Sequence, residues 1–313
     1  MSAIAVSIQQ WLGKIQTAFL NAPLTQKARN HPLVSTASIT ATALIAIYLR
    51  NDYLTFLSIG RGGLPYNVFG WMIGFFIFKP IQFGAEARSS KPYLNSSDPS
   101  YLSPNFPPKR STSRPTLASH PVPQRQITQL ASKEVKLEWS KAFNVIATKA
   151  KDDGLVELMK SKLELRGEAL FALPSKTGAT VTDGAQKGLK RLSGEFAHLH
   201  ATGDHSAHVM LSISDCTLSR LPSHYSTSER SHRILVGSEN SLTFPRHIGK
   251  KVFDAGWGER HAFDDNPFAR AILGRDLPVN YVLIYAPRNK EEIEIVSKIL
   301  KASIAYNTGT SVD

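Results

Sequence analysis

The stretch EFAHLH at residues 195–200, followed by HVMLS at residues 208–212, decides the fold of this 313-residue chain. Both runs are short and largely apolar, and the residues between them, ATGDHSA, are small and polar as in a turn. The pattern predicts two neighbouring strands. Residues 162–173 alternate between apolar and polar side chains, which predicts a half-buried strand and therefore antiparallel pairing.

Helical signals surround these strands. Ser132 is a predicted N-cap, and apolar residues recur at helical spacing after it. The run VNYVLIY at residues 279–285 predicts a strand, and Asn289 then begins a final helix in which Glu292 completes a capping box. Strands and helices follow one another in mixed order, without the regular strand–helix–strand rhythm of a parallel sheet. Residues 132–313 are therefore predicted to form one α+β domain, an antiparallel sheet with flanking helices.

The first 83 residues have the composition of a membrane-anchor region. Residues 2–22 place apolar side chains on one stripe, which predicts an amphipathic helix in the membrane interface. Residues 32–49 carry no charge and predict a transmembrane helix, near the lower length limit of about 17 residues. The aromatic run at 68–78 is too short to span a bilayer and is predicted to be interfacial, re-entrant or packed on the domain. Residues 84–131, rich in Ser and Pro, predict a linker or an extended strap on the domain surface.

Charge and cysteine content narrow the function classes. The formal net charge is +12; residues 1–83 hold six basic residues and one acidic residue, whereas residues 132–313 hold 25 and 22. No nucleic-acid partner is expected, because such proteins concentrate Lys and Arg on the folded domain, and the bias fits anionic membrane lipid better. The single cysteine, Cys216, excludes an intramolecular disulfide and a cysteine zinc cluster. We expect a single-pass protein of the endoplasmic reticulum whose domain faces the cytosol.

Histidines form the strongest candidate site. Alternate residues of a strand share a face, so His198 and His200 are predicted to point the same way, and His208 joins them if the next strand folds back. Histidine transfers protons near neutral pH and is also the commonest metal ligand. With a third ligand, the two strand histidines can hold iron or zinc, but His-x-His alone is a weak signal and no metal is predicted. Satisfied imidazoles without a chemical role are the alternative interpretation.

Two further motifs carry candidate site residues. GWGERH at residues 256–261 predicts a tight turn whose Glu, Arg and His side chains either line a polar pocket or face solvent. YAPRN at residues 285–289 joins a strand end to a helix N-terminus. There Arg288 either binds an anionic substrate group or supports the helix cap.

Taken in this order, the motifs at 195–208, 256–261 and 285–289 resemble the fungal luciferase family, as does DYLTFL at residues 52–57. The resemblance implies an N-terminal membrane anchor and a monooxygenase or dioxygenase domain that uses O2 without an organic cofactor. Luminous members of this family oxidise 3-hydroxyhispidin, an electron-rich pyrone, through a peroxide that loses CO2 and leaves an excited product. A small aromatic or polyketide substrate is therefore expected.

The resemblance suggests a mechanism as a hypothesis. His198 or His200 removes a proton from the substrate enol, and Arg260 or Arg288 stabilises the negative charge that develops as O2 adds. Other residues have supporting roles: His208 and His261 hold or re-protonate oxygens, Glu259 orients a histidine, Asp204 contacts substrate, and Phe196, Trp257 and Tyr285 wall an aromatic ligand.

Residues 216–244 depart from the family pattern. They are rich in Ser and Arg with little periodicity, and we interpret them as an inserted surface loop or a retained intron. Two other functions stay open at this point. One is a membrane-anchored binding protein of the same fold without catalysis, and the other is a metal-dependent enzyme that uses the His-x-His cluster.

Overall fold

The computed structural model describes residues 12–18, 21–23, 30–84, 88, 98–174, 180–216, 251–264, 266–273, 277–278 and 280–312. The chain divides into two compact units, 1–55 and 56–313. Of the helix predicted over 2–22, residues 12–18 are helical, and most of the others fall outside the described ranges. The predicted insertion at 216–244 also lies outside them, apart from the buried Cys216.

Among the described residues, one helix is long and apolar enough to cross a membrane, α3 (Pro32–Ser58). It has 27 residues and continues past the predicted end at residue 49. Arg50 and Asp52 interrupt the apolar composition there but not the helical backbone. By length, composition and position in the chain, α3 fits either a membrane anchor or a signal sequence.

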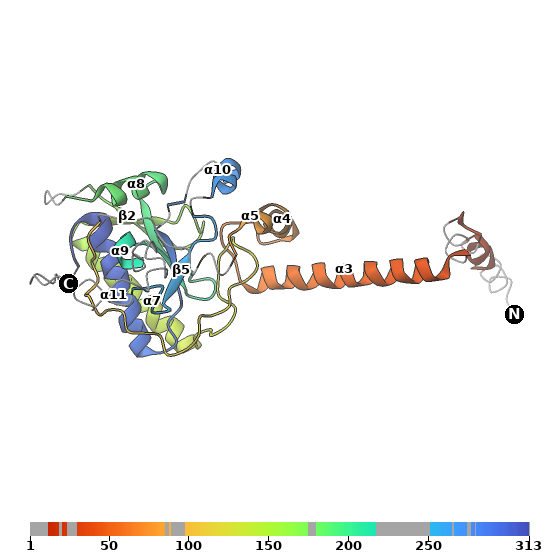
Figure 1. Ribbon diagram of the computed structural model, residues 1–313, viewed down its shortest axis with the longest axis horizontal. Helices are drawn as coiled ribbons and strands as arrows, with labels where there is room; N and C mark the ends of the chain where they lie inside the picture. Colours follow the sequence, from red (N-terminus) through yellow and green to blue (C-terminus); the bar gives the residue numbers. More distant parts are fainter. Residues whose placement is uncertain are drawn as a thin grey trace, which may run out of the picture. The chain divides into compact units, whose positions relative to one another are not determined.

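The second unit is built on an open antiparallel sheet of six strands (Figure 1). In spatial order the strands are β1 (Val156–Lys160), β2 (Glu168–Ala172), β3 (Glu195–Leu199), β4 (Ala207–Met210), β6 (Tyr281–Ile284) and β5 (Gly258–Arg260). All neighbouring pairs are antiparallel. The predicted α+β class with an antiparallel sheet is confirmed.

The strand predicted over 162–173 is wrong in its first half. Residues 161–167 form a turn between β1, which was not predicted, and β2. The hydroxyl of Ser161 accepts the backbone N–H groups of Leu163 and Glu164 at 3.2 and 2.9 Å, and Leu165 has a φ of 60°. A serine side chain that binds local N–H groups competes with a strand ladder, so the alternating pattern runs around a loop here.

The helices described after the strap are α7 (Lys133–Asp152), α8 (Asp183–Arg191), α9 (Ile213–Cys216), α10 (Pro267–Leu273) and α11 (Lys290–Thr308). Helices α7 and α11 pack against each other, and α11 also contacts β2, β3 and β4 (Figure 1). The predicted N-cap is confirmed, because the Ser132 hydroxyl accepts the N–H of Val135. The predicted capping box is half formed. Asn289 caps the N–H of Glu292, but the Glu292 carboxylate accepts the N–H of Arg288.

The aromatic run near residue 70 forms a continuous helical segment. It comprises α4 (Val68–Ile73), the π-helix η1 (Gly74–Phe78) and α5 (Lys79–Ile81). Trp71 and Phe78 are buried, and the Phe78 ring lies 5.5 Å from that of Phe263. One side of this segment therefore packs on the domain, which was one of the three predicted alternatives.

Within the Pro-rich region, residues 98–131 form a strap without helix or strand, apart from an isolated β-bridge between Leu117 and Gln126. It is not confined to the surface, because His120, Gln124 and Arg125 are buried. The backbone N–H of Gln126 donates to Asp204 at 2.7 Å, which ties the strap to the turn between β3 and β4. The compact unit that contains the sheet extends from Phe56 to Asp313 and includes the strap.

Candidate active site

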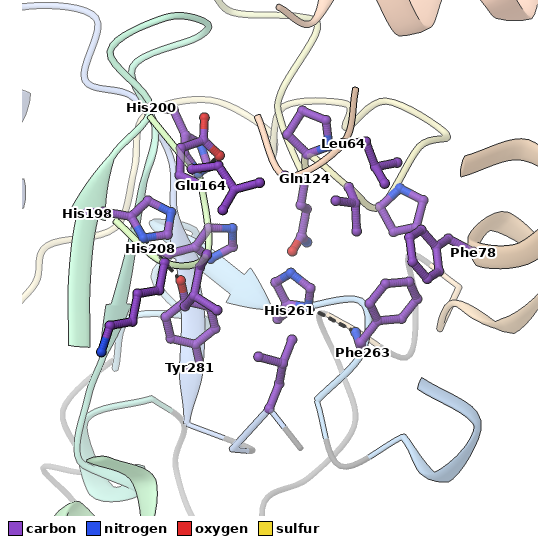
Figure 2. A pocket seen from close by; sticks show the side chains of 18 residues that line it. Leu64, Phe78, Gln124, Glu164, His198, His200, His208, His261, Phe263 and Tyr281 are labelled. Carbon is purple, nitrogen blue, oxygen red and sulfur yellow. Dashed lines mark hydrogen bonds and ion pairs between the residues drawn. The ribbon is translucent and has the colours of Figure 1, made fainter. Parts of the chain in front are cut away.

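Four histidines line one wall of a cavity of about 310 Å³ (Figure 2). The antiparallel register places His198 opposite His208, and His208 opposite Leu283. Glu259 also pairs with Leu283, which puts His261, two residues later, on the same side of the sheet. The centre of the His208 ring lies 4.9 Å from that of His200, 5.5 Å from that of His198 and 5.1 Å from that of His261.

The facing wall of the cavity is apolar. Leu64 and Phe78 come from the segment before the strap, and Phe263 follows β5 (Figure 2). Gln124 of the strap lies between the two walls (Figure 2). A mainly apolar pocket with a few convergent polar groups is typical of a small-molecule site. The lining of this one suits an apolar ligand that carries polar groups along one edge.

His198 is held by a buried carboxylate. Its Nδ1 lies 2.8 Å from Oε1 of Glu195. The same carboxylate accepts the Ser161 hydroxyl and the Lys162 N–H, both at 2.7 Å. Burial alone would raise the pKa of Glu195, but the hydrogen bonds from His198, Ser161 and Lys162 outweigh it and lower that pKa. An ionised Glu195 only accepts hydrogen bonds, so we infer that Nδ1 of His198 carries a proton and that Nε2 is the nitrogen left for substrate.

His200 is held by a second polar chain. Its Nδ1 lies 2.9 Å from the Ser206 hydroxyl oxygen, and Ser206 in turn contacts the carboxylate of Asp204 at 2.8 Å. Among the described residues, Nε2 of His200 has no hydrogen-bond partner, and it lies 4.0 Å from Oε2 of Glu164. Glu164 is paired with Arg125, and both side chains are buried. Burial raises the pKa of Glu164 in spite of this partner.

Three of the four cavity histidines have lowered pKa values. Burial lowers the pKa of His200 and His208 well below the ordinary value, and neighbouring charges on Arg125 or other histidines add to the effect. Burial likewise lowers the pKa of His261 to about 3. The Tyr281 ring stacks on His208 at 4.9 Å, and burial raises the pKa of its phenol well above 10. Near pH 7, Tyr281 is therefore a hydrogen-bond donor and these three imidazoles are uncharged.

Acid should destabilise the domain through these histidines. Below pH 6.5 the unfolded chain protonates His261 while the folded chain does not, so stability present at neutral pH is lost as the pH falls towards 3. Between pH 7 and pH 5 the loss for His261 is about 2 kcal/mol, and His200 and His208 act in the same direction. Urea unfolding of the full chain in detergent at both pH values measures the change. His261→Gln should remove about 2 kcal/mol of the pH dependence, and an unchanged dependence would exclude His261 as its source.

The structure keeps the predicted charged residues away from the histidines. Arg260 pairs with Val282, on the opposite face of β5 from Glu259, and its guanidinium forms an ion pair with Asp264. Glu259 does not contact a histidine in the described structure. It accepts Nε of Arg88 at 2.6 Å and the Tyr285 hydroxyl at 2.8 Å. Strand alternation explains the position of Arg260. The Glu259 carboxylate is instead occupied by Arg88, Tyr285 and Gln124 of the strap, whose Nε2 donates to it at 3.4 Å.

Arg288 supports the helix cap, the second of its two predicted roles. Its Nε donates to the Glu292 carboxylate at 2.9 Å, and Nη1 donates to the Thr112 hydroxyl at 2.7 Å. It does not line the cavity among the described residues. Its partner Glu292 lies four residues later, in the first turn of α11, so the cation is neutralised locally.

None of the three predicted aromatic wall residues lines the described cavity. A register shift opposite Leu170 and Phe171 takes Phe196 out of alternation with His198, and Phe196 packs in the hydrophobic core. The Trp257 indole N–H donates to the carbonyl of Pro108 at 2.6 Å. The Tyr285 hydroxyl donates to the Glu259 carboxylate. Asp204 reaches the site only through Ser206 and His200.

Several site residues were not predicted as such: Gln124, Glu164, Glu195 and Tyr281. Tyr281 had a readable signal, because alternation along β6 places it on the face of Leu283 and so next to His208. Glu195 was visible in the motif EFAHLH, but its contact with His198 depends on the register shift. Glu164 comes from a turn and Gln124 from the strap. Neither segment has a periodic sequence from which the direction of its side chains can be predicted.

Comparison with known proteins places the chain in a family. A luciferase-domain family model matches residues 237–303, a range that begins inside the predicted insertion. The chain is 30% identical over 286 residues to a luciferase of Armillaria mellea, covering 90% of each protein. It is 30% identical over 276 residues to a luciferase of Armillaria gallica and 27% identical over 271 residues to one of Neonothopanus nambi, covering 87% and 86% of this chain. The matched stretches cover 86% and 85% of those two proteins. No solved structure matches the chain.

Proposed function

The chain belongs to the luciferase family of luminous fungi, and we propose that it is a membrane-bound oxygenase that adds O2 to an electron-rich pyrone or phenolic polyketide. Luciferase-named relatives support an oxygenase in general. The pyrone substrate and the absence of an organic cofactor are part of the proposal. Light emission depends on the fate of the peroxide, and the resemblance leaves it open.

The observation that carries the proposal is the Glu195–His198 pair on the wall of a cavity with uncharged histidines and an apolar face. A carboxylate that holds an imidazole through Nδ1 fixes the tautomer and stabilises the imidazolium that forms when Nε2 takes a proton. A binding protein without catalysis needs no such oriented base. The apolar face accommodates an aromatic ring and excludes water from the reacting edge.

The chemistry then follows from these groups. His198 takes the enol proton, and the resulting enolate carbon gives an electron pair to O2, forming a carbon–oxygen bond and a peroxide anion. The proton on His198 returns to the peroxide oxygen, so substrate plus O2 yields a hydroperoxide with no other reactant. Tyr281 replaces the two predicted arginines as the donor to the developing negative charge, because its phenol is protonated and lines the cavity.

Membrane anchoring is the second part of the proposal. The 27-residue length and apolar composition of α3 support a single span. A cleaved signal sequence is the alternative, and alkaline washing of membranes from cells that express the chain distinguishes the two. A spanning α3 keeps the full-length chain in the pellet, whereas a cleaved chain is shorter and leaves with the wash.

A metal-dependent oxygenase is a second candidate, which one cluster favours. Single ligand atoms of Glu164, His198 and His200 lie within 4.8 Å of one another, and Nδ1 of each histidine is already held by a polar partner. Two histidines and a carboxylate are the ligand set of non-haem iron oxygenases, in which the metal activates O2. His198 would then be a ligand and not a base, so the two candidates exclude each other.

Oxygen consumption with 3-hydroxyhispidin tests the function, using membranes that contain the full-length chain and a photon counter. We expect O2 uptake, with or without light. Iron and zinc analysis of the purified chain distinguishes the two candidates: less than about one metal per five chains with full turnover supports base catalysis. No uptake with this pyrone or with related phenolic polyketides would overturn the proposal.

A further inference from the structure

We propose that the helical segment Val68–Ile81 rests on a lipid surface and that the cavity opens beside it, so that the aromatic substrate enters from the membrane interface and not from water. The substrate part of this inference rests on the proposed function, whereas the lipid contact does not. Both parts follow from residues of the second unit alone.

The segment Val68–Ile81 has two different sides. Trp71 and Phe78 are buried against the domain, but Phe69 and Phe76 on the same helical segment are 69% and 61% exposed. The other exposed apolar side chains of this segment are Val68, Met72 and Ile77. Phe76 lies against Phe75 and Trp71, with ring centres 4.9 and 6.4 Å apart, so its exposed ring belongs to an aromatic cluster. A cluster of large apolar side chains facing water is uncommon in a monomeric protein and marks a contact surface.

The composition around this surface identifies the partner as a lipid interface. Arg61 lies over the Tyr66 ring at 5.5 Å, and Lys79 lies over the Phe75 ring at 4.9 Å. Aromatic side chains with adjacent cations are enriched where a protein meets lipid headgroups, and the cations are attracted to anionic lipid. Ser58, the last residue of α3, precedes Val68 by ten residues, so the chain places the segment within about 35 Å of the end of that helix.

The inner side of the same region forms part of the cavity. Leu64, just before α4, and Phe78, at the end of η1, both line it (Figure 2). The turn at 161–167 lies next to this region, since the N–H of Gly63 donates to the carbonyl of Glu164 at 3.0 Å. That turn also lines the cavity, and its Leu165 is 50% exposed at a φ of 60°. The cavity therefore has an apolar rim on the side where the exposed aromatic cluster begins.

The apolar rim favours entry of an aromatic substrate from lipid. Leu64 and Leu165 gain nothing from facing water, and burial of an apolar side chain at a lipid interface is favourable in proportion to its area. An aromatic pyrone dissolved in the interface is concentrated at this rim. Capture of the pyrone from lipid therefore needs no charged loop at the mouth of the cavity.

Two labelled variants test the lipid contact without any assay of activity. Cys216 is the single cysteine and is buried, so a Cys216→Ala background allows one spin label at Phe76→Cys, or at Leu137→Cys on α7 as a control of similar exposure (57%). In nanodiscs with anionic lipid, the label at residue 76 should be accessible to dissolved oxygen and protected from a water-soluble nickel chelate. The label at residue 137 should show the reverse. Equal behaviour at the two positions would overturn the lipid contact.

Kinetics in lipid vesicles test the entry route. Phe69→Ser with Phe76→Ser should raise KM for 3-hydroxyhispidin several-fold and leave kcat unchanged, because neither side chain lines the cavity. Leu137→Ser with Val145→Ser, on the exposed side of α7, is the matched control and should change neither constant. Equal KM values for the two variants would overturn the route. If the unaltered chain shows no turnover, the function fails, and the label experiment still decides the lipid contact.

Discussion

Replacing His198 by alanine should lower kcat for O2 consumption by about 10²–10⁴-fold, the usual contribution of a positioned general base. The imidazole is the one cavity histidine whose Nδ1 is held at 2.8 Å by a carboxylate with a lowered pKa. Burial lowers the pKa of His200 and His208 well below the ordinary value, and we do not expect either of them to replace His198. Steady-state O2 uptake measures the loss, and circular dichroism confirms that the variant is folded.

Glu195→Gln separates positioning from simple packing. A glutamine at residue 195 keeps the shape but no longer fixes the proton of His198 on Nδ1, so kcat should fall by about tenfold or more and KM should change little. His205→Ala serves as the control. His205 lies in the segment between β3 and β4, close in the chain to His198, but it does not line the described cavity. Near-normal kcat in both His198→Ala and Glu195→Gln would exclude His198 as the base. Because the metal candidate uses His198 as a ligand, the same result would count against that candidate as well.

Replacing Arg125 by leucine should destabilise the folded chain by about 3–5 kcal/mol, as expected when one partner of a buried ion pair is removed. Arg125 is completely buried and pairs with Glu164. It also donates to the carbonyls of Ile59 and Arg61 at 2.7 and 2.8 Å, which ties the segment after α3 to the domain. Urea unfolding at pH 7 in detergent measures the loss.

Two controls show whether the ion pair is the cause. Lys149→Met breaks an exposed pair with Asp153 on α7 and should cost less than about 1 kcal/mol. Adding Glu164→Leu to Arg125→Leu removes the uncompensated buried carboxylate. The loss of unfolding free energy in the double variant should therefore be smaller than the sum of the losses in the two single variants. Additive losses would show that Arg125 stabilises the fold through the carbonyls of residues 59 and 61 and not through Glu164.

The sequence was sufficient for the parts of the molecule in which neighbours along the chain decide the structure. The helix caps at Ser132 and Asn289 depend on residues three positions away, and both form. The strands of the motif EFAHLH and of residues 207–210 also form, and alternation with one sharp turn places His198, His200 and His208 on one wall. The prediction over 162–173 failed where a single serine side chain redirected the backbone.

Only the tertiary structure decided which charged groups reach the histidines. Arg260 and Arg288 were expected at the site, but each is neutralised by a carboxylate four residues later in the chain. Glu164 and Gln124, which do line the cavity, come from a turn and a Pro-rich strap. Local spacing fixes the face on which a side chain lies, because a strand has a period of two residues. Which residues face the histidines across the cavity depends on the packing of segments far apart in the chain. The periodicity of the sequence does not predict that packing.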